Sequence, residues 1–331
     1  MTHMEHMQQD EQEKQRAQRV RRMLFRIGKG LISLGIIYWI LRQIDLGEFR
    51  TFVTGHTTTV LYVFLLALAQ WAMEFIRFSV ALRTGGLAQS PGRVFRAFLM
   101  GFSFRFVLPG NQGEIGKMIF VEGTPASRIA VYIYEKLGFV MALLLVFVVG
   151  FAWIYPQFVY VSIIIFGIIL LVLILWNRLF TNRLMKTHLP QALRRRRPLL
   201  VQIPLAAVTL TIISLQYYLF LYEAGLTLPE TIAIVSIIMT VILIPITLAG
   251  LGLRESAAVV LLAPFGVSAE MSTAIPFIVF IINVAVPALI GAVLLVFSRS
   301  YLPGQKLSQL QISSVIDLKR IYRSLRTASA E

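Results

Sequence analysis

Acidic and basic side chains stand close together inside long apolar stretches of this sequence. The residues concerned are Glu74 and Arg77, Arg105, Glu114 and Lys117, Glu135 and Lys136, and Arg254 and Glu255. A charge at the centre of a bilayer costs about 2.5–3.5 kcal/mol on insertion scales, so such residues are expected to be functional or paired. Because residues three positions apart share a helix face, we favour a salt bridge between Glu74 and Arg77.

Two interruptions rich in proline and glycine come just before two of the charge pairs. The first runs from Pro109 to Gly113 and precedes Glu114, and the second runs from Pro245 to Gly252 and precedes Arg254. A half-helix that begins after such a break presents a positive dipole end and free N–H groups. If the N-terminal ends of two such half-helices face each other beside basic side chains, they would bind an anionic group such as a phosphate. Neighbouring carboxylates would hold the bases in place or bind a cationic group.

We predict that the interruptions and the nearby charges form one binding site within the membrane. Irregular backbone is tolerated inside a bilayer only where protein or a wet cavity covers its polar groups. The amides of Gln216 and Asn283 are weaker candidates, because a lone amide in a span more often bonds a neighbouring helix. The predicted site consists of Arg105, Pro109, Gln112, Gly113, Glu114, Lys117, Glu135, Lys136, Gly250, Gly252, Arg254 and Glu255.

The composition indicates that membrane helices position this site. Of the 331 residues, 57% are hydrophobic and only 14% are charged, whereas soluble proteins carry about 25% charged residues. The mean hydropathy is +0.76, and several apolar blocks approach or exceed the ~20 residues that cross a bilayer. We therefore predict an all-α, polytopic membrane helical bundle. Its six spans are expected at about Ile27–Ile44, Val60–Val80, Ile129–Trp153, Phe158–Trp176, Leu200–Tyr222 and Ala274–Phe297.

Two further apolar regions, Val94–Val121 and Thr231–Ala263, contain the interruptions. We predict that each forms a helical hairpin. The first arm, Val94–Leu108, would reach only about 22 Å at 1.5 Å per residue, which favours a re-entrant hairpin, with a fully spanning hairpin as the alternative. Each half of the chain, at about 60–153 and 200–297, then contains a span, a hairpin and a span. Because the hairpins would enter from opposite sides, we predict an inverted repeat.

Basic residues indicate the orientation of the spans. The formal net charge is +15, and bases gather in the N-terminal tail (1–26), in Asn177–Leu199 and in the C-terminal tail (300–331). Glu223–Glu230 has two acids and no base. Because positive loops stay inside, we predict a multi-pass protein of the cytoplasmic membrane with both termini cytoplasmic. The basic tails would contact anionic lipid, and no aromatic-interleaved basic module indicates nucleic acid.

Few residues could hold a cofactor or a metal ion. The sequence has no cysteine, which excludes disulfides and thiolate metal sites. Its four histidines show no ligand spacing. We therefore expect neither a cofactor nor a metal ion.

The two interruptions resemble a pair of motifs known from one family. Pro109–Lys117 resembles the signature P-G-x-x-G-E-x-x-R/K of the lysylphosphatidylglycerol synthase transmembrane-region family, and Gly250–Ala257 resembles its second motif, G-G-x-G-x-R-E-x-A. The dipeptide Glu135-Lys136 matches the family's E-R/K position. Lys117 stands where Arg is common, which keeps the charge but loses bidentate geometry. Ala249 stands where the second motif usually has Gly.

This resemblance, which covers about residues 26–299, implies a flippase-like transmembrane domain at 27–299 that moves phospholipids or related polar lipids between leaflets. It does not imply lysyl transfer, because only about 34 residues follow the last span and a soluble aminoacyl-transferase domain needs far more. We therefore expect no enzymatic activity. The alternatives are an accessory membrane subunit that partners a lipid or lipid-linked glycan synthesis enzyme and, less favoured, a membrane enzyme. A homo-oligomer also remains open.

Overall fold

The computed structural model describes residues 46–106, 112–181, 197–244 and 250–297. In these ranges every regular element is a helix, and all of them belong to one compact unit that ends at Phe297. The predicted first span Ile27–Ile44, the two basic tails and Pro109 lie outside the described residues.

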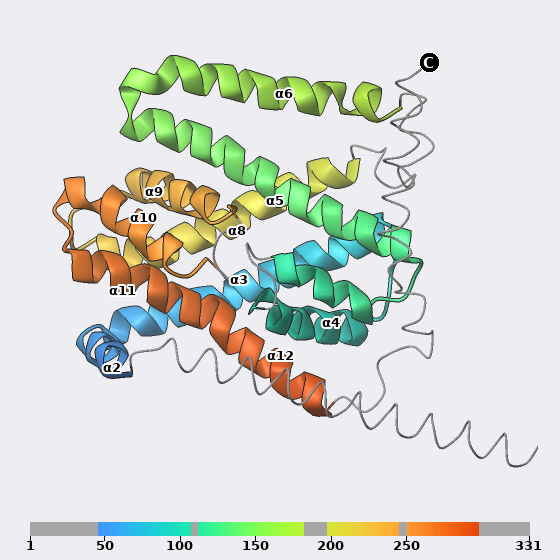
Figure 1. Cartoon of the computed structure of the whole chain (residues 1–331), viewed down its shortest axis with the longest axis horizontal. Coiled ribbons are helices and arrows are strands. Elements are labelled where there is room, and N and C mark those ends of the chain that lie inside the picture. Colours follow the sequence, from blue (N-terminus) through green and yellow to red (C-terminus); the bar gives the residue numbers. More distant parts are fainter. Residues whose placement is uncertain (1–45, 107–111, 182–196, 245–249, 298–331) are drawn as a thin grey trace, which may run out of the picture. The chain divides into compact units, whose positions relative to one another are not determined.

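Five long apolar helical segments run through the described residues (Figure 1). Each is long and apolar enough to cross a membrane, and together they fall on five of the six predicted spans. Large apolar side chains face outward along them, such as Ile164 and Ile174 at 62% and 67% exposed, and this surface suits lipid rather than water. The segments are α3 (Thr57–Thr84), α5 (Pro125–Ile154), α6 (Val159–Thr181), α8 (Arg197–Leu221), and α11 (Ala269–Phe280) continued through the π-helical turn η6 (Ile281–Ala285) into α12 (Val286–Phe297).

Shorter helices occupy the two interrupted regions. At 1.5 Å per residue, α4 (Pro91–Ser103) and α9 (Leu228–Val241) reach only about 20 Å and α10 (Leu253–Leu262) about 15 Å. The 3-10 helix η2 (Gln112–Phe120) reaches about 18 Å. Each is shorter than the ~30 Å hydrocarbon core. The choice between re-entrant and fully spanning hairpins and the inverted orientation of the two halves stay predictions. The 3-10 turn η1 (Phe104–Phe106) follows α4, and the short helix α2 (Leu46–Gly55), which lies outside both regions, precedes α3.

The local sequence explains where α5 and α9 begin. Pro125 is the first residue of α5, where its missing N–H costs nothing, and the Thr124 hydroxyl accepts a hydrogen bond from the Ser127 N–H at 3.2 Å. At α9, the Thr227 hydroxyl and backbone N–H both donate to Glu230 Oε2, at 2.7 and 2.8 Å. These two hydrogen bonds hold the pKa of Glu230 below its ordinary value.

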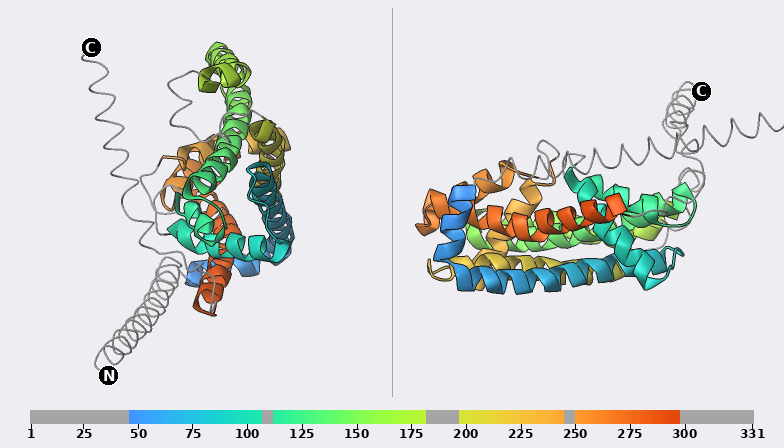
Figure 2. Two further views of the ribbon diagram at one scale, coloured as in Figure 1. Left: turned by 90° about the vertical axis from the view of Figure 1, so that its right-hand side faces the viewer. Right: turned by 90° about the horizontal axis from the view of Figure 1, so that it is seen from below.

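Each interrupted region packs against long helices of the other half of the chain. The short helix α4 lies against α12, and α9 lies against α5, while α3 and α8 run side by side (Figure 2). One apolar cluster joins the end of α3, α4 and the start of α5 to η6 and α12. A second joins the start of α3 to α8, α9, α10 and α11. The two halves of the chain therefore pack into one another.

The helix α12 approaches α4 most closely at Gly291. A Cβ atom at this position would lie 2.1 Å from the backbone carbonyl oxygen of Leu99. Beside this contact, the Ser103 hydroxyl donates a hydrogen bond of 2.9 Å to the Ala288 carbonyl oxygen. Small residues and interhelical hydrogen bonds of this kind let membrane helices approach each other.

Gly291→Ala is expected to destabilise the protein by about 1–3 kcal/mol, as overpacking typically does, because the Leu99 backbone cannot move aside. Gly167→Ala in α6 is the matched control, since a Cβ at Gly167 would meet no atom within 4 Å. Thermal unfolding of the detergent-solubilised protein should show a lower melting temperature for Gly291→Ala alone. Equal melting temperatures for the two variants would contradict the close contact.

Candidate functional site

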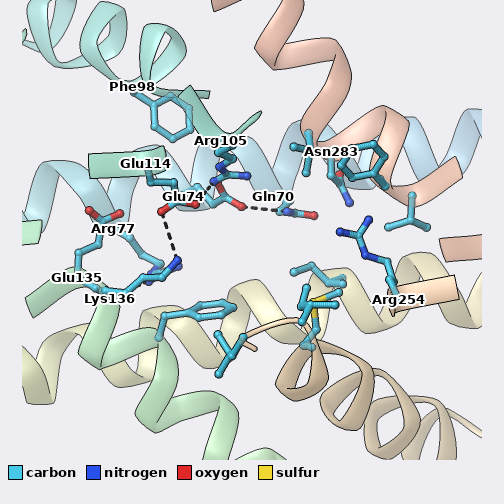
Figure 3. A pocket seen from close by; sticks show the side chains of 18 of the residues that line it. Gln70, Glu74, Arg77, Phe98, Arg105, Glu114, Glu135, Lys136, Arg254 and Asn283 are labelled. Carbon is cyan, nitrogen blue, oxygen red and sulfur yellow. Dashed lines mark hydrogen bonds and ion pairs between the residues drawn. The ribbon is translucent and has the colours of Figure 1, made fainter. Parts of the chain in front are cut away.

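A cavity of about 110 Å³ lies among the long helices and is lined by residues of both apolar clusters (Figure 3). A single water needs only ~10–15 Å³ by the same measure, so the cavity can hold a larger polar group. The first interrupted region reaches the cavity through η1 and η2, and the second through the end of α9 and the start of α10. The cavity is therefore lined by described residues on both sides of each interruption.

Arg105 of η1 joins two carboxylates at the cavity wall. Its Nη2 atom lies 2.9 Å from Glu74 Oε2 and 2.7 Å from Glu114 Oε1. The guanidinium carbon also lies 4.0 Å from the ring centroid of Phe102, a cation–π contact that helps to fix its position. Since Glu74 belongs to α3 and Glu114 to η2, Arg105 connects a long helix to both sides of the first interruption.

Lys117 and Lys136 complete this charge cluster. Lys117 Nζ lies 2.7 Å from Glu135 Oε2 and 4.6 Å from the ring centroid of Phe78. Lys136 Nζ lies 3.8 Å from Glu114 Oε2. The residues Glu135 and Lys136 of α5 thus pair with different residues of η2, and they tie this helix to the first interruption.

The predicted salt bridge between Glu74 and Arg77 is wrong. Glu74 pairs with Arg105, whereas Arg77 donates a hydrogen bond of 3.3 Å to the Glu135 carbonyl oxygen. Glu114 and Lys117 are likewise paired with other residues and not with each other. The physical reason is that these side chains face a shared cavity, where partners from neighbouring helices lie closer than the residue three positions away.

A chain of amide hydrogen bonds extends from the charge cluster across the bundle. Gln70 Nε2 donates to Glu74 Oε1 at 3.0 Å, and Gln216 Nε2 donates to Gln70 Oε1 at 3.2 Å. Gln216 also exchanges hydrogen bonds with Asn283, whose Nδ2 atom donates to Gln216 Oε1 at 2.5 Å. Asn283 lies in the π-helical turn, and such turns are frequent at functional sites. The amides therefore connect α3, α8 and the last long segment through the cavity wall.

Arg254 enters the cavity from the second interruption. Its guanidinium carbon lies 4.8 Å from the Phe280 ring centroid, and Figure 3 shows it at the end of the cavity beside Asn283, away from Glu114 and Lys136. Gly250 and Gly252 have φ angles of +80° and +79°, a conformation that favours glycine. They form the turn into α10, which places Arg254 in the first helical turn.

Six of the twelve predicted site residues line the cavity, namely Arg105, Glu114, Lys117, Glu135, Lys136 and Arg254. Gly250 and Gly252 shape the turn beside it, and Glu255 accepts a hydrogen bond from the Gly252 N–H at 2.7 Å, so it caps α10. Gln112 and Gly113 begin η2 and are described by their backbone alone. Pro109 lies outside the described residues.

The cavity carries an excess of positive charge. Five bases line it, Arg77, Arg105, Lys117, Lys136 and Arg254, against the three acids Glu74, Glu114 and Glu135. The difference is two positive charges among the described lining residues. An environment of this kind favours a negatively charged ligand, because uncompensated buried charge is costly.

Three polar lining residues were not singled out from the sequence at all, namely Gln70, Tyr132 and Tyr217. Glu74, Arg77 and Asn283 were singled out but not included in the predicted site, and they line the cavity as well. Gln70 could have been found, because it stands four positions before Glu74, the spacing at which helical side chains meet. The two tyrosines carry no such signal, since a tyrosine in an apolar helix is usually a packing or interfacial residue.

The comparisons with known proteins identify a family. The family model described as the lysylphosphatidylglycerol synthase TM region matches residues 26–291. The chain belongs to this family. No curated protein matches it significantly.

Membership of the lysylphosphatidylglycerol synthase TM region family confirms the resemblance of the two motifs. The matched residues include both interruptions and every described lining residue of the cavity. Together with the five membrane-crossing helices, the match identifies an integral membrane protein of a family connected with lipid metabolism.

Proposed function

We propose that this protein is a lipid translocase whose central cavity binds the anionic headgroup of a phospholipid or a related polar lipid. The observation that carries the proposal is the cavity itself, which both interrupted regions line and which has two excess positive charges. A phosphate group would supply the missing negative charge, and strong charge-assisted hydrogen bonds to Arg and Lys would hold it. The acyl chains would stay in the surrounding lipid.

We also infer that the two halves of the chain form an inverted repeat around this cavity. In the first half α3, the interrupted pair α4 and η2, and α5 follow one another; in the second half α8, the pair α9 and α10, and α11–α12 do so. Transporters of this plan bind substrate where the repeats meet and move one repeat against the other. A headgroup held between the two interruptions would be exposed to each leaflet in turn.

The proposed setting is the cytoplasmic membrane, with both termini on the cytoplasmic side. The distribution of bases between the loops supports this orientation. The basic tails would then lie against the leaflet that is rich in anionic lipids, from which a phosphate-bearing substrate could enter the cavity.

The proposal is tested by reconstituting the full chain into vesicles that contain fluorescently labelled phosphatidylglycerol. A reductant added outside quenches only the labels in the outer leaflet, so transfer between leaflets is expected to expose the protected fraction. Vesicles without protein and vesicles with heat-denatured protein serve as controls. Identical protection in all three preparations would exclude lipid translocation, and a change in the mass of the recovered lipid would instead indicate an enzyme.

A further inference from the structure

The acidic side chains that line the cavity gather at one of its ends. Each of the three acidic lining residues lies within 4 Å of a base of the charge cluster: Glu74 and Glu114 near Arg105, and Glu135 near Lys117. A ligand anion at this end would compete with protein carboxylates. The other end, where Figure 3 shows Arg254 beside the neutral amide of Asn283, holds none of these three carboxylates.

Tyr217 of α8 provides a second and independent feature of the Arg254 end. The residue lines the cavity and is 0% exposed. Its hydroxyl has no hydrogen-bond partner among the described residues, although it interacts electrostatically with Arg254 and Glu255. Because a buried hydroxyl without a partner is costly and uncommon, this one is suited to a ligand.

The start of α10 adds positive potential at the same place. Arg254 is the second residue of this helix, and a helix N-terminus favours an anion. Glu255, the next residue, holds the turn before the helix, because its Oε2 atom accepts a hydrogen bond from the Gly252 N–H at 2.7 Å, and it does not line the cavity. The contact of Arg254 with the Phe280 ring at 4.8 Å fixes the guanidinium in place.

We propose that Tyr217 and Arg254 form a subsite for the oxyanion of a phosphate ester, with the Tyr217 hydroxyl donating one hydrogen bond and the Arg254 guanidinium supplying the charge. This assignment rests on the proposed function and deepens it, because it places the phosphate at the Arg254 end of the cavity. The charge cluster around Arg105 then faces the remaining, polar part of the headgroup.

The test is equilibrium binding to the detergent-solubilised full chain. The probes are dihexanoyl-phosphatidylglycerol, inorganic phosphate and the neutral dihexanoylglycerol. Tyr217→Phe is expected to weaken dihexanoyl-phosphatidylglycerol binding about tenfold, as the loss of a hydrogen bond to a charged group does. Tyr218→Phe is the matched control, because it makes the same change one residue away on α8, outside the cavity lining. Equal affinities for Tyr217→Phe and the unaltered protein would overturn the subsite.

The stability of the ligand-free protein gives a second readout. Removing a buried hydroxyl that has no partner should leave the melting temperature unchanged or raise it. A clear drop for Tyr217→Phe would mean that the hydroxyl serves the fold, for example through a bound water, and would overturn the assignment.

The probes also identify the source of the phosphate. If inorganic phosphate binds and Tyr217→Phe weakens its binding, the subsite accepts a free phosphate. If only dihexanoyl-phosphatidylglycerol binds, the subsite requires the lipid. The two proposals can fail separately. If the unaltered protein transfers lipid between leaflets but Tyr217→Phe binds dihexanoyl-phosphatidylglycerol with unchanged affinity, only the subsite is wrong. If Tyr217→Phe weakens binding but the unaltered protein transfers no lipid, only the translocase proposal is wrong.

Discussion

Replacing Arg105 by methionine is expected to destabilise the protein by about 3–5 kcal/mol, the cost of breaking a buried ion pair by removing one partner. Arg105 is 9% exposed, and it is the base nearest to both Glu74 and Glu114, at 2.9 and 2.7 Å. Without it, the two carboxylates face each other in a low dielectric. At about 2–4 °C per kcal/mol, the melting temperature in detergent should fall by on the order of 10 °C.

The matched control for this variant is Arg93→Gln. Arg93 forms an ion pair with Glu122 at 2.6 Å, but the two side chains are 50% and 63% exposed. Exposed pairs contribute only about 0–1 kcal/mol. The two substitutions therefore remove similar contacts in different environments, and similar melting temperatures would show that the cavity is not a low-dielectric site.

A neutral replacement of the Arg105–Glu74 pair separates its charge from its packing. In the combination of Arg105→Met and Glu74→Gln, Glu114 keeps Lys136 at 3.8 Å, so no carboxylate is left without a base. Since neutral groups of similar volume often replace buried ion pairs without loss, this variant should regain most of the stability lost by Arg105→Met alone. A double variant as unstable as the single one would assign the effect of Arg105 to packing against Phe102.

The long helices could be predicted from the sequence because hydrocarbon thickness imposes a simple rule on length and polarity. The predicted Val60–Val80 and Leu200–Tyr222 both fall on observed helices, α3 and α8. The helix ends were less predictable: α3 begins three residues earlier and ends four residues later than predicted. Helices are extended beyond the apolar core by polar residues such as Thr57 and Thr84, which a pattern of hydrophobicity does not register.

The site was only partly predictable, because charge identifies candidates but not partners. Charged residues in apolar stretches were correctly expected near one another, and six of the predicted residues do share the cavity. The sequence spacing favoured a salt bridge between Glu74 and Arg77, whereas in the fold Glu74 pairs with Arg105, which is 31 positions away. The Gln70–Gln216–Asn283 connection joins three helices, and no local spacing could indicate it.

Arg254→Gln is expected to slow the transfer of phosphatidylglycerol between leaflets by about 10- to 150-fold. A hydrogen bond to a charged group contributes about 1.5–3 kcal/mol, which corresponds to that range of affinities. The change also removes one of the two excess positive charges of the cavity. Arg83→Gln is the control, because it removes the same charge from an exposed position at the end of α3.

Arg254→Lys distinguishes charge from geometry. Lysine keeps the positive charge but lacks the planar fork that binds two oxygens of a phosphate. If charge alone attracts the headgroup, Arg254→Lys should transfer phosphatidylglycerol nearly as fast as the unaltered protein; if the fork is needed, it should resemble Arg254→Gln. Full transfer by Arg254→Gln itself would mean that the phosphate lies elsewhere. The charge cluster around Arg105 would then be the place to look for it, since the other bases of the cavity are gathered there.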